Sequence, residues 1–525
     1  MNFSTIRAAG DPGSSLAGPR AYWMFLSVLV LMAWVTAGVT TSKYGAGVAS
    51  DSVKYLAVAQ SLLDGRGFVN HLGAPLLSWP PLYSMTLAGL SLSTGWDVFV
   101  AGWYLNVFLI GLNLFMSGLI FFRIFQKKLL YASLASLFVL TALSSLRIHA
   151  TISSDPLYLT LTLGFLLAIH PYIKTRSTRA FAWMVVFSAL APMQRYIGMA
   201  LAVTAVIVIF TENRKSHRIL LRDSFVLGFL SALPIGWWLI LRNIMTYGTL
   251  FGTGSPATDV VKNIMLALTK MLHWFVPYHP LLMPILTRPW IPLGILLFIL
   301  FLINKKENWR AWLQKSIEPS TYPTLLHGAV YFTAVALTIV TKDHLDLTSD
   351  RYYTIMLVPA AVLFLITVDT LILPHLKLST RRAEVALVAI FTLLSIYPLL
   401  GMGKYLQRSL EIGEPSNYNY YNSSEFRDTP VVAEMIKLAK DHPHALIYSN
   451  YVDAAWFYTR NPVSLLPFIN NTDKGWPHDK PGYIIWFEPN EFKHYLSPQE
   501  LGQFAHLELI HQSESGSIYY VRSRE

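Results

Sequence analysis

The chain of 525 residues contains no cysteine and few charged residues, since Asp, Glu, Lys and Arg make up only 14% of it. Without cysteine it can form no disulfide, bind no metal through a thiolate and use no cysteine nucleophile. Hydrophobic residues make up 53% of the chain, and its mean hydropathy is +0.42. A water-soluble globule of this length needs more charge than this. The composition therefore predicts a protein embedded in a lipid bilayer.

The formal net charge of +11 would make nucleic acid the first partner to consider for a soluble protein. The charge, however, is unevenly distributed. Residues 1–400 contain 30 Lys and Arg against 15 Asp and Glu, whereas the remaining residues contain 11 against 15. The basic excess thus lies between hydrophobic runs, and no nucleic-acid partner is expected.

Eleven stretches approach the roughly 20 apolar residues that a helix needs to cross a bilayer. They are 21–40, 98–122, 129–146, 156–173, 180–192, 197–211, 224–241, 290–303, 322–340, 354–374 and 384–400. Two of them, 180–192 and 197–211, are short and closely spaced, which indicates a tight pair or a broken hairpin, and Pro192 is expected to end the first helix. The predicted fold is an α-helical polytopic membrane protein with about 11 transmembrane helices.

Basic residues set the expected orientation. With residues 1–20 in the cytoplasm, 19 of the 30 basic residues of the first part fall on the inner side, as the positive-inside rule requires. This assignment treats 81–95 as a juxtamembrane helix on the outer face, because a further span there would invert every later loop. Residues 21–400 then form the transmembrane domain, and its two long outer loops are 41–97, with a helix at 52–63, and 242–289.

The pattern changes after residue 400. Residues 401–424 are rich in Gly, Asn, Tyr and Pro and are predicted to be a linker. Short strands and helices then alternate, which predicts a small α/β domain at 425–525, outside the cell or in the periplasm. The expected elements are helices 425–440, 451–459 and 497–505, strands 445–449, 463–468 and 482–488, and a hairpin over 507–522.

Eight of the 15 acidic residues in the first 400 positions map to the predicted outer face. They are Asp51, Asp64, Asp97, Asp155, Asp259, Asp343, Asp346 and Asp350. Ionisable groups at the ends of spans are costly and therefore candidates for function. Asp51 and Asp155 could equally be helix caps, since each begins a predicted helix.

Two arginines are candidates for binding a phosphate on the same face. Arg195 lies at the turn between the two short helices, where a guanidinium could donate two hydrogen bonds to a phosphate or form an ion pair with Asp51 or Asp155. Arg351 and Tyr352 adjoin the tenth span. A divalent cation on His149 or Asp155, or on His344 with nearby acids, stays possible, although the spacing matches no ligand template. No other cofactor is indicated.

Several motifs together resemble one known family. They are Asp51-Ser-Val-Lys54-Tyr55, Trp79-Pro80-Pro81-Leu82-Tyr83, Ser154-Asp155-Pro156-Leu157-Tyr158, Arg195-Tyr196-Ile197-Gly198 and Arg351-Tyr352. As a set they resemble the GT-C glycosyltransferase superfamily, and within it the protein mannosyltransferase and aminoarabinose transferase (family 39-like) group of bacterial membrane proteins. The likeness covers residues 20–400. One departure is that many relatives carry an Asp-Glu pair where this chain has Asp51-Ser52.

The resemblance implies an inverting glycosyltransferase of the bacterial inner membrane, which moves a sugar from a polyprenyl-phosphate donor to an acceptor on the outer face. It assigns Asp51 as the catalytic carboxylate of the first loop and Asp155 as a supporting carboxylate. The residues expected to bind substrate or phosphate are Lys54, Tyr55, Arg195, Tyr196, Arg351 and Tyr352. The acceptor, whether lipid, polysaccharide or protein, and the identity of the sugar are left open.

Physical reasoning about the same residues agrees with this chemistry. Phosphate is a good leaving group, so the reaction needs a base for the acceptor hydroxyl and cations for the departing charge. A carboxylate at the bilayer edge is partly desolvated, which is expected to raise its pKa. The aromatic residues Tyr55, Trp79, Tyr83, Trp274 and Tyr278 either stack on the substrate or form an interfacial belt.

Two other functions compete with this one. A transporter or flippase of lipid-linked sugars is the main alternative, although internal repeats and ionisable groups at the membrane midplane are not evident. A non-catalytic assembly subunit is the third.

Overall fold

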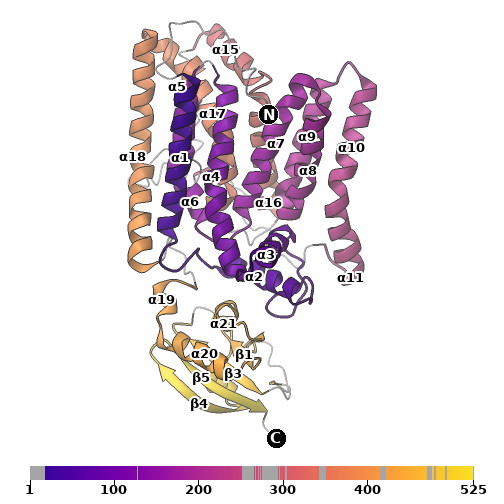
Figure 1. Ribbon diagram of the computed structural model, residues 1–525, viewed down its shortest axis with the longest axis vertical. Helices are drawn as coiled ribbons and strands as arrows, with labels where there is room; N and C mark the ends of the chain where they lie inside the picture. Colours follow the sequence, from indigo (N-terminus) through magenta and orange to yellow (C-terminus); the bar gives the residue numbers. More distant parts are fainter. Residues whose placement is uncertain are drawn as a thin grey trace.

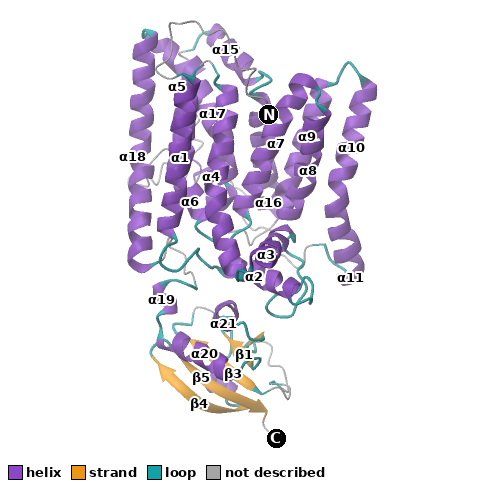
Figure 2. Ribbon diagram, in the orientation of Figure 1, coloured by secondary structure: helices purple, strands orange, loops and turns teal. Residues whose placement is uncertain are grey.

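The structure is a computed structural model that places a bundle of long helices above a small α/β domain (Figure 1). It describes residues 18–126, 128–250, 304–341, 350–413, 421–469, 481–490 and 494–523, together with Trp476, Pro477 and scattered positions between 265 and 301. Helices dominate the bundle, and strands occur in the C-terminal domain (Figure 2).

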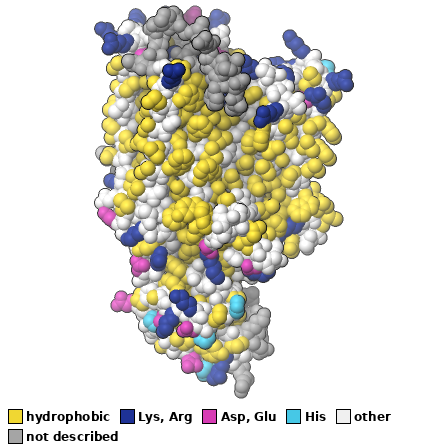
Figure 3. Space-filling view, in the orientation of Figure 1, with side chains coloured by type: hydrophobic (Ala, Val, Ile, Leu, Met, Phe, Trp, Pro, Cys, Tyr) yellow, Lys and Arg dark blue, Asp and Glu magenta, His cyan; other side chains and the backbone are white. Residues whose placement is uncertain are grey.

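The helices of the bundle follow the predicted apolar stretches closely. They are α1 (Pro19–Thr40), α4 (Val98–Ile124), α5 (Leu129–Thr141), α6 (Leu143–His149), α7 (Asp155–Thr175), α8 (Thr178–Gln194), α9 (Met199–Glu212), α10 (His217–Gly236), α11 (Met245–Tyr247), α16 (Tyr322–Thr341), α17 (Leu357–Thr367) and α18 (Thr380–Ile412). Short 3-10 or π turns join several of them, including Tyr196–Gly198 and Asp350–Tyr352. Apolar side chains cover the flank of the bundle, as expected for a surface that faces lipid (Figure 3).

Among the described residues, six helices are long and apolar enough to cross a membrane, or seven if the bent pair α5 and α6 counts as one span. The chain is therefore a polytopic membrane protein. The prediction of about 11 spans is not reached by this count. Helices α8, α9 and α16 fill three further predicted stretches without being among the six, and most of 290–303 lies outside the described residues.

The first long loop carries the two helices expected there. These are α2 (Ser50–Leu63) and α3 (Leu82–Thr94), which lie at the end of the bundle nearest the α/β domain (Figure 1). We call this the Asp51 end of the bundle, because Asp51 lies in the first turn of α2. The second loop, 242–289, lies largely outside the described residues.

The segment 401–424, predicted to be a linker, begins instead with more helix. Helix α18 continues through residues 401–412 and ends at Gly413, which adopts the left-handed conformation with φ of 68°. The apolar pattern stops near residue 400, but the following residues include good helix formers such as Lys404, Leu406 and Gln407. Helix α18 therefore continues for 12 residues beyond the end of its apolar stretch at residue 400.

The C-terminal domain has the α/β character that the sequence predicts. Its strands are β1 (Leu446–Ser449), β2 (Val463–Leu465), β3 (Gly482–Phe487), β4 (Ala505–Ser513) and β5 (Gly516–Ser523), in the order β2-β1-β3-β5-β4. Strands β1, β2 and β3 are parallel, whereas β5 pairs antiparallel with β3 and β4. Its helices are α19 (Ser424–Arg427), α20 (Pro430–Asp441), α21 (Val452–Thr459) and α22 (Pro498–Leu501).

Two predicted helices of this domain differ in extent. The helix expected at 425–440 is divided in two, because Pro430 starts a new helix at a position where its missing amide hydrogen is not needed. The helix expected at 497–505 ends at Leu501. Ser497 and Glu500 cap its start, and β4 begins only four residues after Leu501, at Ala505.

Candidate active site

Backbone pairing brings the start of the first loop against the segment that precedes α7. The amide of Gly47 donates to the carbonyl of Ala150 at 2.8 Å, and the amide of Ile152 donates to the carbonyl of Gly47 at 2.9 Å. The Ser52 hydroxyl, buried beneath α2, donates to the carbonyl of Ile152 at 2.6 Å. These bonds fix the first turn of α2 beside the turn that carries Asp155.

Asp155 is the first residue of α7 and is held in place by its neighbour in the chain. Ser154 shares a hydrogen bond with the Tyr55 hydroxyl at 3.1 Å, and its carbonyl accepts from the Gln194 side chain at 2.8 Å. Tyr55 comes from α2 and Gln194 from the end of α8, next to Arg195. Three separate segments therefore meet at one point.

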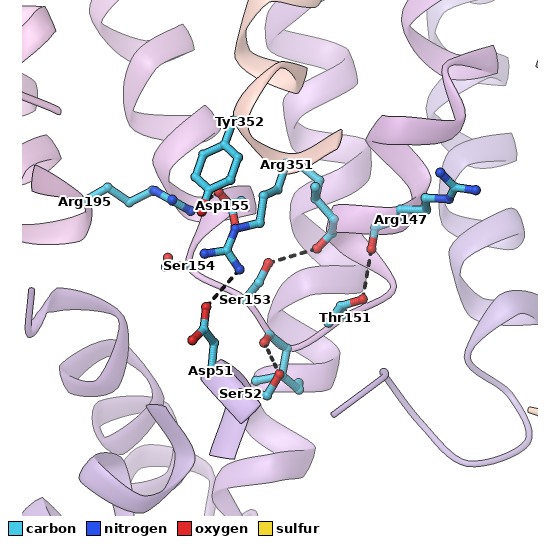
Figure 4. Close-up of polar contacts among 12 residues, drawn as sticks. Asp51, Ser52, Arg147, Thr151, Ser153, Ser154, Asp155, Arg195, Arg351 and Tyr352 are labelled. Carbon is cyan, nitrogen blue, oxygen red and sulfur yellow. Dashed lines mark hydrogen bonds and ion pairs between the residues drawn. The ribbon is translucent and has the colours of Figure 1, made fainter. Parts of the chain in front are cut away.

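Charged side chains of alternating sign line this meeting point (Figure 4). Arg351 donates from Nη1 to Asp51 Oδ2 at 2.9 Å, and its Nε lies 4.0 Å from Asp155 Oδ2. Arg195 in turn forms an ion pair with Asp155 Oδ1. The order is Asp51, Arg351, Asp155, Arg195, and we call this set the charge chain.

The ring of Tyr352 lies beside both cations of the charge chain. The guanidinium carbons of Arg351 and Arg195 are 5.1 Å and 5.4 Å from the ring centroid. Contacts of this kind are attractive because the aromatic face is electron-rich. Tyr352 therefore helps to keep two like charges close together.

Exposure differs along the charge chain. The side chains of Asp155 and Arg195 are 4% and 15% exposed, whereas those of Asp51 and Arg351 are each 28% exposed. Asp155 Oδ2 and Arg351 Nε have no hydrogen-bond partner within the part of the chain that the structure describes. The Asp51 and Arg351 half of the charge chain is therefore the half that a bound molecule can reach.

Burial acts against the ionised form of Asp51, but cations outweigh it. Desolvation alone would raise the pKa of Asp51, and the nearby charges of Arg351, Lys54 and Arg195 bring the pKa below its ordinary value. The expectation that desolvation raises this pKa was therefore wrong, because it left out the partner supplied by Arg351. Asp51 is an ionised carboxylate at neutral pH.

The other predicted binding residues surround the charge chain at different depths. Lys54, one turn after Asp51, lies 4.6 Å from the ring centroid of Trp79. Tyr55 lies on the buried face of α2, and its ring belongs to the hydrophobic core there. The hydrogen bonds of Tyr196 are with residues outside the charge chain. Its hydroxyl donates to the carbonyl of Leu77 at 2.8 Å and accepts from Trp238 at 3.2 Å.

Of the remaining predicted aromatic residues, Tyr83 is fully buried and donates to Asn106 at 3.2 Å. Trp274 belongs to the core of the bundle. Tyr278 lies outside the described residues. Of the described aromatic residues predicted to stack on the substrate, Trp79 at the Asp51 end is half-buried and stays a candidate.

The metal site considered for His149 is not found. His149 is buried, its Nε2 lies 3.0 Å from the Asn113 amide nitrogen, and its Nδ1 lies 2.7 Å from the carbonyl of Ser145. Both ring nitrogens are thus engaged with neutral groups. No cluster of three His, Asp or Glu side chains suited to a metal occurs among the described residues, and Asp343, His344 and Asp346 lie outside them.

Sequence reasoning missed two side chains that hold the first loop. Arg242 donates to the carbonyl of Leu76 at 2.6 Å and stacks 4.0 Å from the Trp238 ring centroid. His71 Nε2 lies 2.8 Å from Asp453 Oδ1 of the C-terminal domain. Arg242 could be anticipated from the sequence, because it is an arginine at the end of the apolar stretch 224–241. No sequence pattern marked His71 or Asp453 as a contact.

Comparisons with known proteins give structural relatives only. No family model matches the sequence, and no curated protein matches it. ArnT from Cupriavidus metallidurans in the apo state is similar in structure, with a TM-score of 0.59 and 13% identity over 95% of this chain and 98% of that one. The same enzyme bound to undecaprenyl phosphate has a TM-score of 0.59 with 12% identity, over 96% and 98% of the two chains.

A more distant match is AglB, an oligosaccharyltransferase from Archaeoglobus fulgidus in complex with an inhibitory peptide and a dolichol-phosphate. Its TM-score is 0.53 with 10% identity, over 96% of this chain and 75% of that one. Identities this low establish the fold alone. The chain therefore shares the fold of ArnT and AglB, in agreement with the GT-C resemblance of its motifs.

Proposed function

We propose that this protein is an inverting glycosyltransferase that moves a sugar from a polyprenyl-phosphate donor to an acceptor at the Asp51 end of the bundle. The observation that carries the proposal is the placement of Arg351 between the accessible carboxylate of Asp51 and the buried Asp155. The fold supports the choice of donor, because ArnT and AglB have been solved with undecaprenyl phosphate and dolichol-phosphate respectively.

The charge chain supplies the two groups that such a reaction needs. Asp51 accepts the proton of the acceptor hydroxyl while the acceptor oxygen attacks the anomeric carbon of the sugar. The bond from that carbon to the phosphate oxygen breaks, and the carrier leaves as polyprenyl phosphate with the bonding electrons. Arg351 and Arg195 stabilise this charge by donated hydrogen bonds. Attack from the face opposite the phosphate inverts the configuration at the anomeric carbon.

Binding of the donor also activates Asp51 in this scheme. Arg351 keeps the pKa of Asp51 low while the two are paired. A phosphate that draws the guanidinium toward itself weakens this pairing and leaves Asp51 in a partly buried setting. The pKa of Asp51 then rises, and its basicity with it. The base thus becomes stronger when the leaving group is in place.

The distribution of basic residues supports a site on the outer face. Lys128, Arg176 and Lys315 come from the ends of helices opposite to the Asp51 end, where Figure 3 also shows Lys and Arg gathered. The positive-inside rule makes that opposite end cytoplasmic. The protein is then a multi-pass protein of the bacterial inner membrane, with its α/β domain in the periplasm or outside the cell.

A vesicle experiment tests the proposal against transport of the intact lipid. The purified protein is reconstituted and given a polyprenyl-phosphate sugar, and both release of polyprenyl phosphate and movement of uncleaved donor across the bilayer are measured. We expect cleavage that depends on an acceptor, with a product of inverted anomeric configuration. Movement of intact donor without cleavage would overturn the proposal in favour of a flippase.

A further inference from the structure

The segment that leads into the C-terminal domain is attached to the first loop by hydrogen bonds. The side-chain oxygen of Asn422 accepts from the amide of Val48 at 2.9 Å, and its nitrogen donates to the carbonyls of Tyr44 at 3.0 Å and Ala46 at 2.9 Å. The amide of Tyr421 donates to the carbonyl of Val48 at 2.9 Å. The last first-loop residue in these contacts, Val48, lies two residues before Ser50, the first residue of α2.

Helix α2 and the C-terminal domain also share one hydrophobic core. Val53, Leu56 and Ala57 of α2 belong to the same buried cluster as Ala455 and Trp456 of α21. That cluster continues into the sheet of the domain, as far as Ile485 and Ile518. The helix that carries Asp51 is therefore packed on the C-terminal domain as well as on the bundle.

Within this interface, Asp453 of α21 is an acidic residue that pairs with the first loop. Its Oδ1 lies 2.8 Å from His71 Nε2, and its Oδ2 accepts from the Tyr421 hydroxyl at 3.4 Å. Burial would raise the pKa of Asp453, but His71, Lys54 and a hydrogen bond from Ser50 hold that pKa below its ordinary value. Asp453 thus pairs with His71 of the first loop and lies beside Ser50, the residue just before Asp51.

We propose that Asp453 is a positioning residue for the active site, which holds the first turn of α2 through Ser50 and His71 so that Asp51 meets Arg351. The proposal rests on the function proposed above. It gives the C-terminal domain a part in catalysis without any contact with the substrate.

The expected size of the effect follows from how sharply transfer depends on geometry. Misplacement of a reacting group by about 1 Å can lower a rate by about 100-fold. Asp453→Asn keeps the shape of the side chain but removes its charge, so the first turn of α2 loses an anchor while the shared core stays. We expect kcat to fall by about 10- to 100-fold. The KM for the donor should stay nearly unchanged, because the arginines that bind phosphate are untouched.

Arg460→Gln is the matched control. Arg460 lies 3.6 Å from Asp97 across the same interface, and its other contacts within the described part of the chain are with the rings of Trp456 and Phe457 rather than with the first turn of α2. Both variants are prepared as full-length protein, and the fraction that binds polyprenyl phosphate is titrated so that rates refer to folded protein. Hydrogen exchange of the backbone amides of residues 50–56 is then compared with that of the unchanged protein.

We expect faster exchange in residues 50–56 and a lower kcat for Asp453→Asn, and neither change for Arg460→Gln. Unchanged exchange and kcat in Asp453→Asn would overturn the proposal, and so would an equal loss in both variants, since that would reflect docking in general. If exchange changes only in Asp453→Asn but even the unchanged protein transfers no sugar, the positioning contact stands and the proposed function fails.

Discussion

At the scale of single residues, the site depends on groups that hold charged side chains in place as much as on the charges themselves. Ser52 illustrates this, since its buried hydroxyl accepts from the amide of Ala49 at 3.0 Å and donates to the carbonyl of Ile152. Ser52 therefore connects α2 to the segment before Asp155, at the position where the family resemblance would lead one to expect a second acidic residue.

The first prediction concerns this connection. Ser52→Ala leaves a buried amide and a buried carbonyl without the hydroxyl, which is expected to lower the free energy of unfolding by about 1–3 kcal/mol. Transfer should fall as well, because Asp51 is the preceding residue. Denaturation of the purified protein measures the first effect. Ser42→Ala is the control, because the Ser42 hydroxyl bonds only locally in an exposed turn, and equal stability losses in the two variants would contradict the account.

The second prediction concerns the pKa of Asp51. In the free enzyme this pKa is low, so kcat/KM should stay level as pH falls until it passes below the ordinary range of an aspartate. Arg351→Gln removes the largest lowering influence, so burial dominates and the pKa rises. The acid limb of kcat/KM should therefore move to higher pH. Arg222→Gln, at the opposite end of the bundle, should leave the profile unchanged. A limb that stays in place in Arg351→Gln would remove Asp51 as the base.

At the scale of elements, the sequence predicted where the helices lie along the chain but not which residues of different helices contact one another. Apolar runs predicted α1, α4 and α7 within a few residues, because a lipid-facing helix must be apolar along its whole length. The end of α18 was missed, since no lipid requirement marks residues 401–412. The pairing of Asp51 with Arg351 joins positions 300 residues apart, and no local pattern encodes it. Resemblance to a family marked both residues as candidates but did not predict their contact.

The third prediction concerns the turn between α8 and α9, which presents Arg195. A Cβ atom on Gly198 would lie 2.3 Å from the backbone carbon and oxygen of Ala191, so the turn cannot stay closed with any larger residue. Gly198→Ala is expected to destabilise the protein by about 1–3 kcal/mol and to lower transfer by displacing Arg195. Thermal unfolding and transfer rates measure these effects. Gly228→Ala, where a Cβ would meet no atom within 4 Å, should be tolerated, and equal tolerance at Gly198 would contradict the account.

At the scale of the whole molecule, the bundle, the first loop and the α/β domain share one buried hydrophobic cluster at the Asp51 end. Composition predicted a membrane protein, and the alternation of short strands and helices after residue 400 predicted a small α/β domain. The joint core of α2 and α21 was not predictable, since ordinary apolar residues form it. Nor could the sequence show that His71 and Asp453, far apart in the chain, lie side by side.

The fourth prediction concerns orientation, and it uses the absence of cysteine from the chain. Glu514→Cys places a single thiol on an exposed turn of the α/β domain, and Arg310→Cys places one on the exposed surface of α15 (Lys306–Ser316) at the opposite end. A membrane-impermeant thiol reagent added outside intact cells should label Glu514→Cys only. Arg310→Cys should be labelled only after the membrane is opened. The reverse pattern would place the charge chain in the cytoplasm.

The fifth prediction, the loss of sugar transfer on removing one charge at Asp51, tests the central claim most directly. Asp51→Asn is compared with Asp64→Asn, which changes an exposed carboxylate paired with Arg66 at the other end of α2. We predict that both variants bind polyprenyl phosphate, that Asp64→Asn transfers sugar at the normal rate, and that Asp51→Asn loses at least about 100-fold in kcat. Normal transfer by Asp51→Asn, with binding intact, would contradict the account.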